Sequence, residues 1–352
     1  MRADVAVAVI GAGQAGLACG YHLRRAGLDH LILDRHSSPG GAWQSTWPSL
    51  RLFSSSAHSS LPGWPMPSHP DAFPPVDHAL SYLAAYERRY ALPVERPVTV
   101  QDVHSGDECL DVVTDRGLLR ARHVINATGT WSAPFVPQVE GARSFGGRQI
   151  HSAHYRGPED FAGQRVAVVG GGNSGVQITA DLVDHAAQVS LVSARRLRFL
   201  PDDVDGRHLF AQATARLTQP DEAEAAFVGN VVALPRVREA RAKGALRLRA
   251  MFDRMTPTGA VIGRDHLDLD AVIWCTGFRP ALRHLRSLGL RTSRGIPEVE
   301  GHRSVRDPRV SFIGYGDWTG PASATLIGVG RTAKALVGDL AGELRPRGAS
   351  GS

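Results

Sequence analysis

Two glycine-rich turns are the residues of this chain best suited to chemistry. "GAGQAG" occupies residues 11–16 and "GGGNSG" residues 170–175. In such turns the first glycine permits the tight bend, the second lets the backbone approach a pyrophosphate, and the third lets the helix lie close to the strand. Both turns are therefore predicted to bind dinucleotides, the first through Gly11, Gly13, Gln14, Ala15 and Gly16, and the second through Gly170, Gly172, Asn173, Ser174 and Gly175.

The residues that follow each unit distinguish the two ligands. Asp34, with Arg35 beside it, ends the strand after the first turn, where a carboxylate accepts hydrogen bonds from an adenosine ribose. Ser193, Arg195 and Arg196 end the corresponding strand of the second unit, and no acid stands there. A hydroxyl and guanidinium groups bind a 2′-phosphate that a carboxylate would repel. The second ligand is therefore predicted to be NADPH rather than NADH.

Both turns lie within strand, turn, helix, strand patterns. "VAVAVIGAGQAGLACGYHLRRAG" is followed by "HLILDRH", and "RVAVVGGGNSGVQITADLVDHA" by "QVSLVSARR". Each pattern is a βαβ unit. The fold class predicted is α/β with two dinucleotide-binding (Rossmann-like) domains.

The remaining elements are less regular. Residues 40–77 are rich in Ser, Pro, Trp and His without a sustained period, which predicts a long ordered loop that covers a site. A helix is predicted from an N-cap at Asp77, and a hairpin leading into a buried strand from "CLDVVTDRGLLRARHVINATG". A polar helical stretch at about 205–255, two short apolar strands and a closing helix complete the chain.

Composition excludes several function classes. The net charge is +6, but lysines occur only at Lys243 and Lys334 and the arginines are scattered, so no nucleic-acid or anionic-membrane partner is expected. Cys19, Cys109 and Cys275 form no CxxC pair, which argues against a thiolate metal cluster and a vicinal dithiol. No metal is expected.

The N-terminus has the pattern of a buried strand rather than a signal peptide, and no run approaches 18 apolar residues. We therefore expect a soluble, cytoplasmic protein without a membrane partner.

The segment "FGGRQIHSAHY" lies just ahead of the second turn. Through Phe145, Gly147, His151 and Tyr155 it resembles the FxGxxxHxxxY pattern of the flavin-containing monooxygenase superfamily, the class B flavoprotein monooxygenases, and the resemblance covers almost the whole chain. In that superfamily the segment joins two domains and helps to place NADPH. The resemblance therefore implies that His151 and Tyr155 position the cofactor rather than transfer protons.

Further matches extend the resemblance and imply FAD at the first turn. "GGAW", "NATGT", "WCTGF" and "GYGD" are similar to segments around the flavin and at the two domain crossovers, and an Asp in the last segment has a turn cap as its alternative role. The resemblance implies an FAD-binding domain over 1–155 and 276–352, with an NADPH-binding domain inserted at 156–275. The residues implied in cofactor binding are Gly41, Trp43, Thr128, Gly129, Thr276, Gly277 and Asp317.

Within the superfamily, the loop after "PGGAW" and the ending "GPASATLIGVGRTA" look most like the arsenic-operon flavin monooxygenases (ArsO), and also like the plant YUCCA enzymes. Many members place an asparagine in this loop near the flavin, whereas this chain has "FSSSAHSS". Ser54, Ser55, Ser56 and His58 are therefore the possible replacements, with Ser55 and His58 as the candidate catalytic residues and an ordinary loop histidine as the alternative for His58.

The resemblance implies that NADPH reduces FAD and that oxygen then forms a flavin 4a-hydroperoxide, which oxygenates a soft S, N or As centre of a small molecule. Arsenic metabolism is the candidate context, and a homodimer is the candidate assembly. A Baeyer–Villiger monooxygenase is an alternative, although its signature normally ends in Trp and this chain has Tyr155. Three further classes stay open: an NADPH-dependent flavin reductase or oxidase, a disulfide reductase, which the missing CxxC opposes, and a non-catalytic nucleotide-binding protein.

Overall fold

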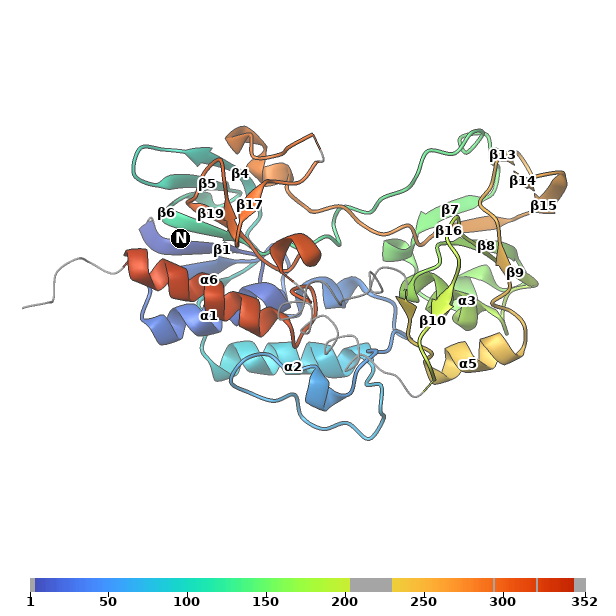
Figure 1. The fold of residues 1–352 in the computed structure, drawn as a ribbon, viewed down its shortest axis with the longest axis horizontal. Helices are drawn as coiled ribbons and strands as arrows, with labels where there is room; N and C mark the ends of the chain where they lie inside the picture. The colour runs from blue at the N-terminus through green and yellow to red at the C-terminus, as the bar shows by residue number, and fades with distance from the viewer. Residues whose placement is uncertain (1–3, 203–229, 294, 321, 345–352) are drawn as a thin grey trace, which may run out of the picture.

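The computed structural model describes residues 4–202, 230–293, 295–320 and 322–344, and its strands form two main sheets (Figure 1). The strand order of the first sheet is β17-β18-β19-β6-β1-β2-β3, and a β4–β5 hairpin joins it through β5 and β6. Its strands are β1 (Asp4–Ile10), β2 (His30–Leu33), β3 (Val94–Glu95), β4 (Val100–Ser105), β5 (Leu110–Thr114), β6 (Gly117–Asn126), β17 (Val299–Glu300), β18 (Arg303–Ser304) and β19 (Val310–Phe312).

The second sheet is wholly parallel, in the order β12-β9-β8-β16-β7. Its strands are β7 (Arg148–His151), β8 (Arg165–Val169), β9 (Gln188–Val192), β12 (Leu248–Arg249) and β16 (Ala271–Trp274). Smaller sheets pair β10 (Arg198–Phe199) with β11 (Asn230–Val231), and β13 (Arg254–Thr256) with β14 (Gly259–Ile262) and β15 (Asp265–Asp268). The α/β class with two Rossmann-like units is confirmed.

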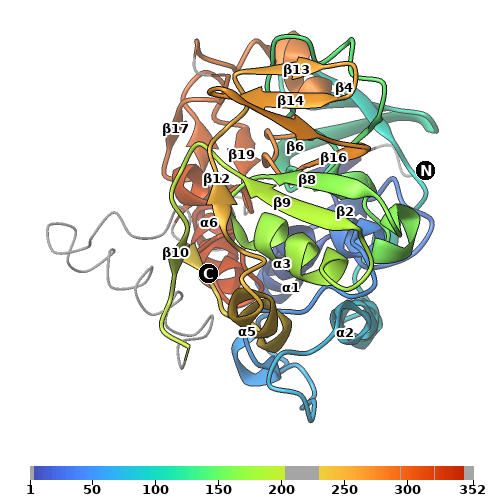
Figure 2. The same cartoon turned by 90° about the vertical axis from the view of Figure 1, so that its right-hand side faces the viewer.

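Helices cover the faces of both sheets. The part of the molecule built on the first sheet is called the first part, and the part built on the second sheet the second part. In the first part, α1 (Gln14–Ala26) packs against α6 (Val329–Leu344), with α2 (Val76–Arg89) beside them (Figure 1). In the second part, α3 (Asn173–Leu182) packs against α5 (Pro235–Ala242) (Figure 2). The central strands β1 and β8 are almost wholly buried, which explains why their sequences are continuous apolar runs rather than alternating ones.

The chain leaves the first sheet after β6 and returns to it for β17, β18 and β19, so the second part is inserted into the first. The domain boundary predicted after residue 155 would assign β7 to the first part, but β7 pairs with β16 in the second sheet.

Helix α2 begins at Val76 with Pro75 as its N-cap, ahead of the expected Asp77 cap. Asp77 lies in the first turn, where its charge still favours the helix. Much of the helical stretch predicted near 205–255 lies outside the described residues.

The predicted loop at 40–77 holds only the short turns η1 (Gly41–Ser45) and η2 (Ser56–His58) before α2 begins. One of its side chains does not cover a site, as the loop was predicted to do. Trp47 is 2% exposed and belongs to the hydrophobic core of the second part, where its ring meets that of Tyr155 edge-on at a centroid distance of 5.9 Å. The loop therefore joins the two parts of the molecule by an apolar anchor.

Trp47→Ala should destabilise the protein by about 3–5 kcal/mol, because it leaves a cavity in the core of the second part. Urea unfolding of the purified protein measures the change. The matched control is Leu118→Ala, since Leu118 is 51% exposed. Equal, small effects of the two substitutions would show that Trp47 anchors nothing.

Candidate functional site

The first glycine turn leaves an open space at the start of α1. A Cβ at Gly16 would lie 1.8 Å from the Gly11 carbonyl oxygen, and one at Gly11 would lie 2.7 Å from that of Ala127. At Gly13, in contrast, a Cβ would meet nothing nearer than Gly41 Cα at 3.9 Å. Gly13 is also the N-cap of α1 and makes no side-chain cap bond. The free N–H groups of α1 thus face a space suited to a diphosphate, as FAD binding requires.

Segments distant in sequence enclose this space. Gly41 adopts a positive φ of 55° and its backbone packs against Gly13. Trp43 Nε1 donates to Gln14 Oε1 at 3.0 Å, and Gln14 Nε2 donates to the Ala324 carbonyl at 2.7 Å. The backbone of Asp317 begins η6 (Asp317–Thr319), while its side chain lies outside the described part of the chain.

Asp34 lies at the carboxyl end of β2 and is 3% exposed. Its Oδ2 accepts from Ala12 N–H at 2.9 Å, and its Oδ1 accepts from the backbone N–H of His36 at 2.8 Å and pairs with His36 Nδ1 at 2.9 Å. Burial alone would raise the pKa of Asp34, but these hydrogen bonds hold it below the usual aspartate range. The carboxylate is therefore charged near neutral pH and has lone pairs left for ribose hydroxyls. The Arg35 side chain is exposed beside it.

The second turn repeats this geometry. A Cβ at Gly175 would lie 2.0 Å from the Gly170 carbonyl oxygen, whereas one at Gly172 would meet nothing within 4 Å. Gly172 is the N-cap of α3 and makes no side-chain cap bond, and Asn173 and Ser174 form the first turn of the helix. Asn173 Oδ1 accepts from Val232 N–H at 3.0 Å. The open space at this helix start fits a second diphosphate.

The ribose-phosphate residues predicted for NADPH lie at the end of β9. Ser193 Oγ accepts from Arg195 N–H at 3.1 Å and would lie 3.0 Å from a Cβ at Gly171, so the hydroxyl borders the turn. The side chains of Arg195 and Arg196 are exposed. The arrangement leaves both guanidinium groups accessible to a phosphate.

The chain passes between the two parts once after β6 and again after β16, and these two crossovers are hydrogen-bonded to each other. Ala281 N–H donates to the Gly129 carbonyl at 2.9 Å, and Phe135 N–H donates to the Gly277 carbonyl at 3.0 Å. Thr276 Oγ1 donates to the Phe135 carbonyl. Gly129 and Gly277 have φ of 62° and 81°, values that favour glycine over residues with a Cβ.

A buried series of hydrogen bonds fixes the crossovers to the first sheet. Burial lowers the pKa of His284 to about 4, so the neutral ring donates from Nε2 to Asn126 Oδ1 at 2.8 Å. Asn126 Nδ2 donates to the Tyr315 hydroxyl at 2.6 Å, which pairs with Thr128 Oγ1 at 2.8 Å. Thr128 Oγ1 donates to the Ala281 carbonyl at 2.8 Å. Among these residues only Thr128 was a sequence-predicted site residue, because the members of the series come together only in the fold.

His151 is engaged at both ring nitrogens. Its Nε2 donates to the Gly277 carbonyl at 2.9 Å, and its Nδ1 accepts from Ala153 N–H at 3.1 Å. Its ring also meets that of Phe278 edge-on. Burial lowers the pKa of His151. A neutral, doubly bonded imidazole holds β7 against the second crossover, which suits a positioning role and leaves no ring nitrogen for proton transfer.

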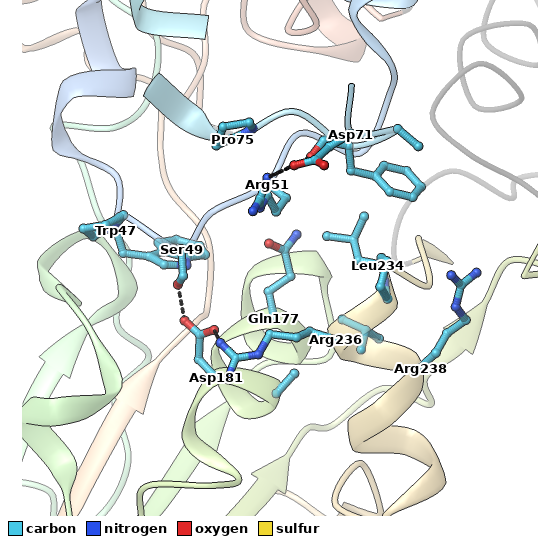
Figure 3. Close-up of a pocket in the computed structure, with 16 residues that line it drawn as sticks. Trp47, Ser49, Arg51, Asp71, Pro75, Gln177, Asp181, Leu234, Arg236 and Arg238 are labelled. Carbon is cyan, nitrogen blue, oxygen red and sulfur yellow. Dashed lines mark hydrogen bonds and ion pairs between the residues drawn. The ribbon is translucent and has the colours of Figure 1, made fainter. Parts of the chain in front are cut away.

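Tyr155 is fully buried, and its hydroxyl lies 3.5 Å from Asp181 Oδ2. Asp181 was not predicted as a site residue from the sequence. A single acid among the apolar residues of a predicted helix could have indicated a buried polar contact. Asp181 accepts from Ser49 Oγ and forms an ion pair with Arg236 Nη1 at 3.2 Å (Figure 3). Burial raises the pKa of Asp181 despite these partners. The Ser49 contact bonds the 40–77 loop to α3.

Ser55 and His58 are brought together, since Ser55 Oγ and His58 Nδ1 lie 3.0 Å apart. Ser56 between them is 6% exposed, and its hydroxyl has no hydrogen-bond partner among the described residues. The loop packs on α2 through Pro62, whose carbonyl accepts from the Tyr86 hydroxyl at 2.6 Å. A catalytic role for Ser55 and His58 stays a prediction.

Known proteins share this fold. The model of the pyridine nucleotide-disulphide oxidoreductase family matches residues 8–304. The chain belongs to this family. A solved flavin-containing monooxygenase from Stenotrophomonas maltophilia is 47% identical, with a TM-score of 0.90 over 97% of this chain and 99% of that one.

Two curated relatives are similar to this chain over different shares of its length. The uncharacterized oxidoreductase CzcO of Bacillus subtilis is 29% identical over 95% of this chain and 99% of its own length. Indole-3-pyruvate monooxygenase YUCCA4 of Oryza sativa subsp. japonica is 33% identical over 57% of this chain, and the match spans about half of that protein. The predictions of a flavoprotein monooxygenase and of FAD and NADPH as its cofactors are confirmed.

The described residues were searched for membrane-spanning helices and for metal-binding clusters. No helix among them is long and apolar enough to cross a bilayer, and they contain no cluster of three or more His, Cys, Asp or Glu suited to a metal ion.

Gly175→Ala should lose stability and Gly172→Ala should lose NADP⁺ affinity, so each variant serves as the control for the other. The added methyl at Gly175 collides with the Gly170 carbonyl, so the variant should lower the midpoint of thermal unfolding. The methyl at Gly172 enters open space, so this variant should unfold normally but bind NADP⁺ at least about tenfold more weakly, or about 1.4 kcal/mol. Calorimetric titration and thermal unfolding check both. Normal NADP⁺ binding by Gly172→Ala would exclude the diphosphate from this turn.

Replacing both Arg195 and Arg196 by Ala should raise the KM for NADPH about ten- to hundredfold, with little change for NADH, because charge-assisted phosphate contacts contribute about 1.5–3 kcal/mol. Steady-state kinetics with each nucleotide measures this. Arg198→Ala is the neighbouring control, and it should leave the preference unchanged. Equal increases for NADPH and NADH would refute the assignment.

Proposed function

We propose that this protein is an NADPH-dependent flavoprotein monooxygenase that transfers one atom of molecular oxygen to a soft S, N or As centre of a small molecule. In this proposal, the FAD-binding domain consists of the residues before β7 and after β16, and the NADPH-binding domain runs from β7 to β16, so the predicted boundary after residue 155 moves back to the start of β7. The similarity to the Stenotrophomonas flavin-containing monooxygenase over nearly the whole chain supports the reaction class.

One observation carries the proposal. The two glycine turns border the same pair of crossovers, because Gly11 lies against the carbonyl of Ala127 and Gly170 against that of Cys275. Ala127 precedes Thr128 in the first crossover and Cys275 precedes Thr276 in the second. Two dinucleotides held at these turns would therefore extend from adjoining points of one paired segment, as hydride transfer between them requires.

Each group has a distinct task. The N–H groups of α1 and α3 would bind the two diphosphates, Asp34 the adenosine ribose of FAD, and Ser193, Arg195 and Arg196 the 2′-phosphate of NADPH. When bound, FAD accepts hydride from NADPH and activates oxygen. His151 orients the second crossover through the Gly277 carbonyl, and Tyr155 with Trp47 holds the 40–77 loop in place.

Two resemblances bear on the identity of the substrate. The resemblance to arsenic-operon monooxygenases favours arsenic as one soft centre, whereas the YUCCA relative is named for indole-3-pyruvate, an α-keto acid. Tyr155 stands where a Baeyer–Villiger signature normally has Trp, which favours a soft nucleophile over a ketone. A flavin reductase or oxidase without oxygen transfer is the second alternative.

Product formed per NADPH consumed, measured together with released hydrogen peroxide, tests the proposal. The reduced holoenzyme is mixed with oxygen and, separately, a thioether, a tertiary amine, arsenite or a cyclic ketone. We expect near-stoichiometric S-oxide, N-oxide or arsenate, with no ester from the ketone. Ester formation would support the Baeyer–Villiger alternative, and peroxide alone with every compound would support the oxidase.

A further inference from the structure

The side chain of Gln14 joins three segments of the first part that are far apart in the sequence. Gln14 is the first residue of α1 and directly follows Gly13 in the first glycine turn. Its Oε1 accepts from Trp43 Nε1 at 3.0 Å, and its Nε2 donates to the Ala324 carbonyl at 2.7 Å. These partners lie in η1 and in the segment that leads into α6. One amide therefore connects the segments that enclose the space at the first turn.

The chemistry of the two partners fixes the orientation of this amide. An indole N–H can only donate a hydrogen bond, and a backbone carbonyl can only accept one. The amide oxygen of Gln14 must therefore face Trp43, and the amide nitrogen must face Ala324. Both ends of the amide are engaged by protein groups, which favours a role in holding these segments over direct contact with a ligand.

The Trp43 side of this connection is anchored in the first part. The indole packs against the hydrophobic core that also contains residues of α1, α2 and α6. In the same turn, a Cβ at Gly41 would lie 2.7 Å from Gly13 Cα, so the two backbones are in close contact. The bond from Trp43 to Gln14 therefore holds η1 against the start of α1.

The segment that carries Ala324 also contacts α1 at its other end. A Cβ at Gly314 would lie 2.8 Å from the Cβ of Ala15. Between these two points the hydroxyls of Thr319 and Ser323 pair at 2.8 Å and brace the segment. Helix α6, which follows, packs along α1 (Figure 1). The bond from Gln14 to the Ala324 carbonyl therefore closes this segment onto the first turn of α1.

We propose that Gln14 is a positioning residue that retains FAD, because its side chain holds η1 and the segment before α6 together across the first glycine turn. This inference rests on the proposed function, which places FAD at that turn. Entry and release of the cofactor both require the enclosing segments to separate, and each separation breaks the two hydrogen bonds. The amide of Gln14 therefore slows the exchange of FAD in both directions and contributes little to its affinity.

Dilution of the FAD-loaded holoenzyme, followed by flavin fluorescence, tests the proposal. Dilution into several final concentrations of FAD gives the rate constants for release and for rebinding. Gln14→Met keeps the length of the side chain and removes both hydrogen bonds. We expect both rate constants to rise about tenfold, the effect of losing two hydrogen bonds of ordinary strength, and the Kd to change less than about threefold.

Gln149→Met is the matched control. Gln149 Oε1 accepts from Trp274 Nε1 at 3.2 Å and its Nε2 donates to the Ala142 carbonyl at 2.8 Å, so Gln149 makes the same two kinds of bond in the second part. This variant should leave both FAD rate constants unchanged. Equal acceleration by the two variants would reflect a general loss of stability and would overturn the proposal.

A double-mutant cycle isolates the bond between Gln14 and Trp43. Trp43→Phe removes the indole N–H and keeps an aromatic ring. The variant with both Gln14→Met and Trp43→Phe should accelerate release by less than the product of the two single effects, because the second change has no bond left to remove. A factor equal to that product would exclude this bond from the retention of FAD.

Gly13→Ala separates the role of Gln14 from the placement of FAD. The added Cβ would meet nothing nearer than Gly41 Cα at 3.9 Å, so this variant should fold and should bind FAD at least about tenfold more weakly. Normal FAD affinity in this variant would remove the cofactor from the turn. Weak binding in Gly13→Ala together with unchanged exchange in Gln14→Met, or with a Kd that rises as much as the release rate, would overturn the role of Gln14 alone.

Discussion

The pairing of the two crossovers is the constraint on which the rest of the structure depends. A chain that leaves one sheet, builds another and returns must pass twice between them, and here the two passages bond to each other through Gly129 with Ala281 and Gly277 with Phe135. Because the pairing is backbone to backbone, it sets where the second sheet starts relative to the first. Arg279 lies over the Phe135 ring at 4.5 Å and Trp131 stacks on Phe278, which adds side-chain contacts to the same junction.

Buried polar groups extend this junction into both parts. The series from His284 through Asn126 and Tyr315 to Thr128 lies on the side of the first sheet, and His151 bonds the second sheet to Gly277. Unpaired polar groups in a core are costly, so such networks favour a single arrangement of their members. A precise junction matters in a two-cofactor enzyme, because small errors in donor position reduce hydride transfer strongly.

The 40–77 loop connects the two parts a second time. Trp47 is inserted into the far core, Ser49 bonds Asp181, and Arg156 Nη1 donates to the Ser45 carbonyl at 3.0 Å. Two separate connections resist rotation between the parts better than one hinge would.

The sequence by itself determined the local parts of this protein. The glycine spacing, the apolar strands and the residues ending β2 and β9 each depend on short-range geometry, so the two Rossmann-like units and both turns were predicted from the chain alone. Only the tertiary structure decided how distant groups meet. Asp181 with Ser49, and His284 with Asn126, are 132 and 158 residues apart, and no periodicity reports such contacts. Trp47 was expected in a cover and lies in a core, because a loop without a period does not reveal which surface its aromatic side chains will find.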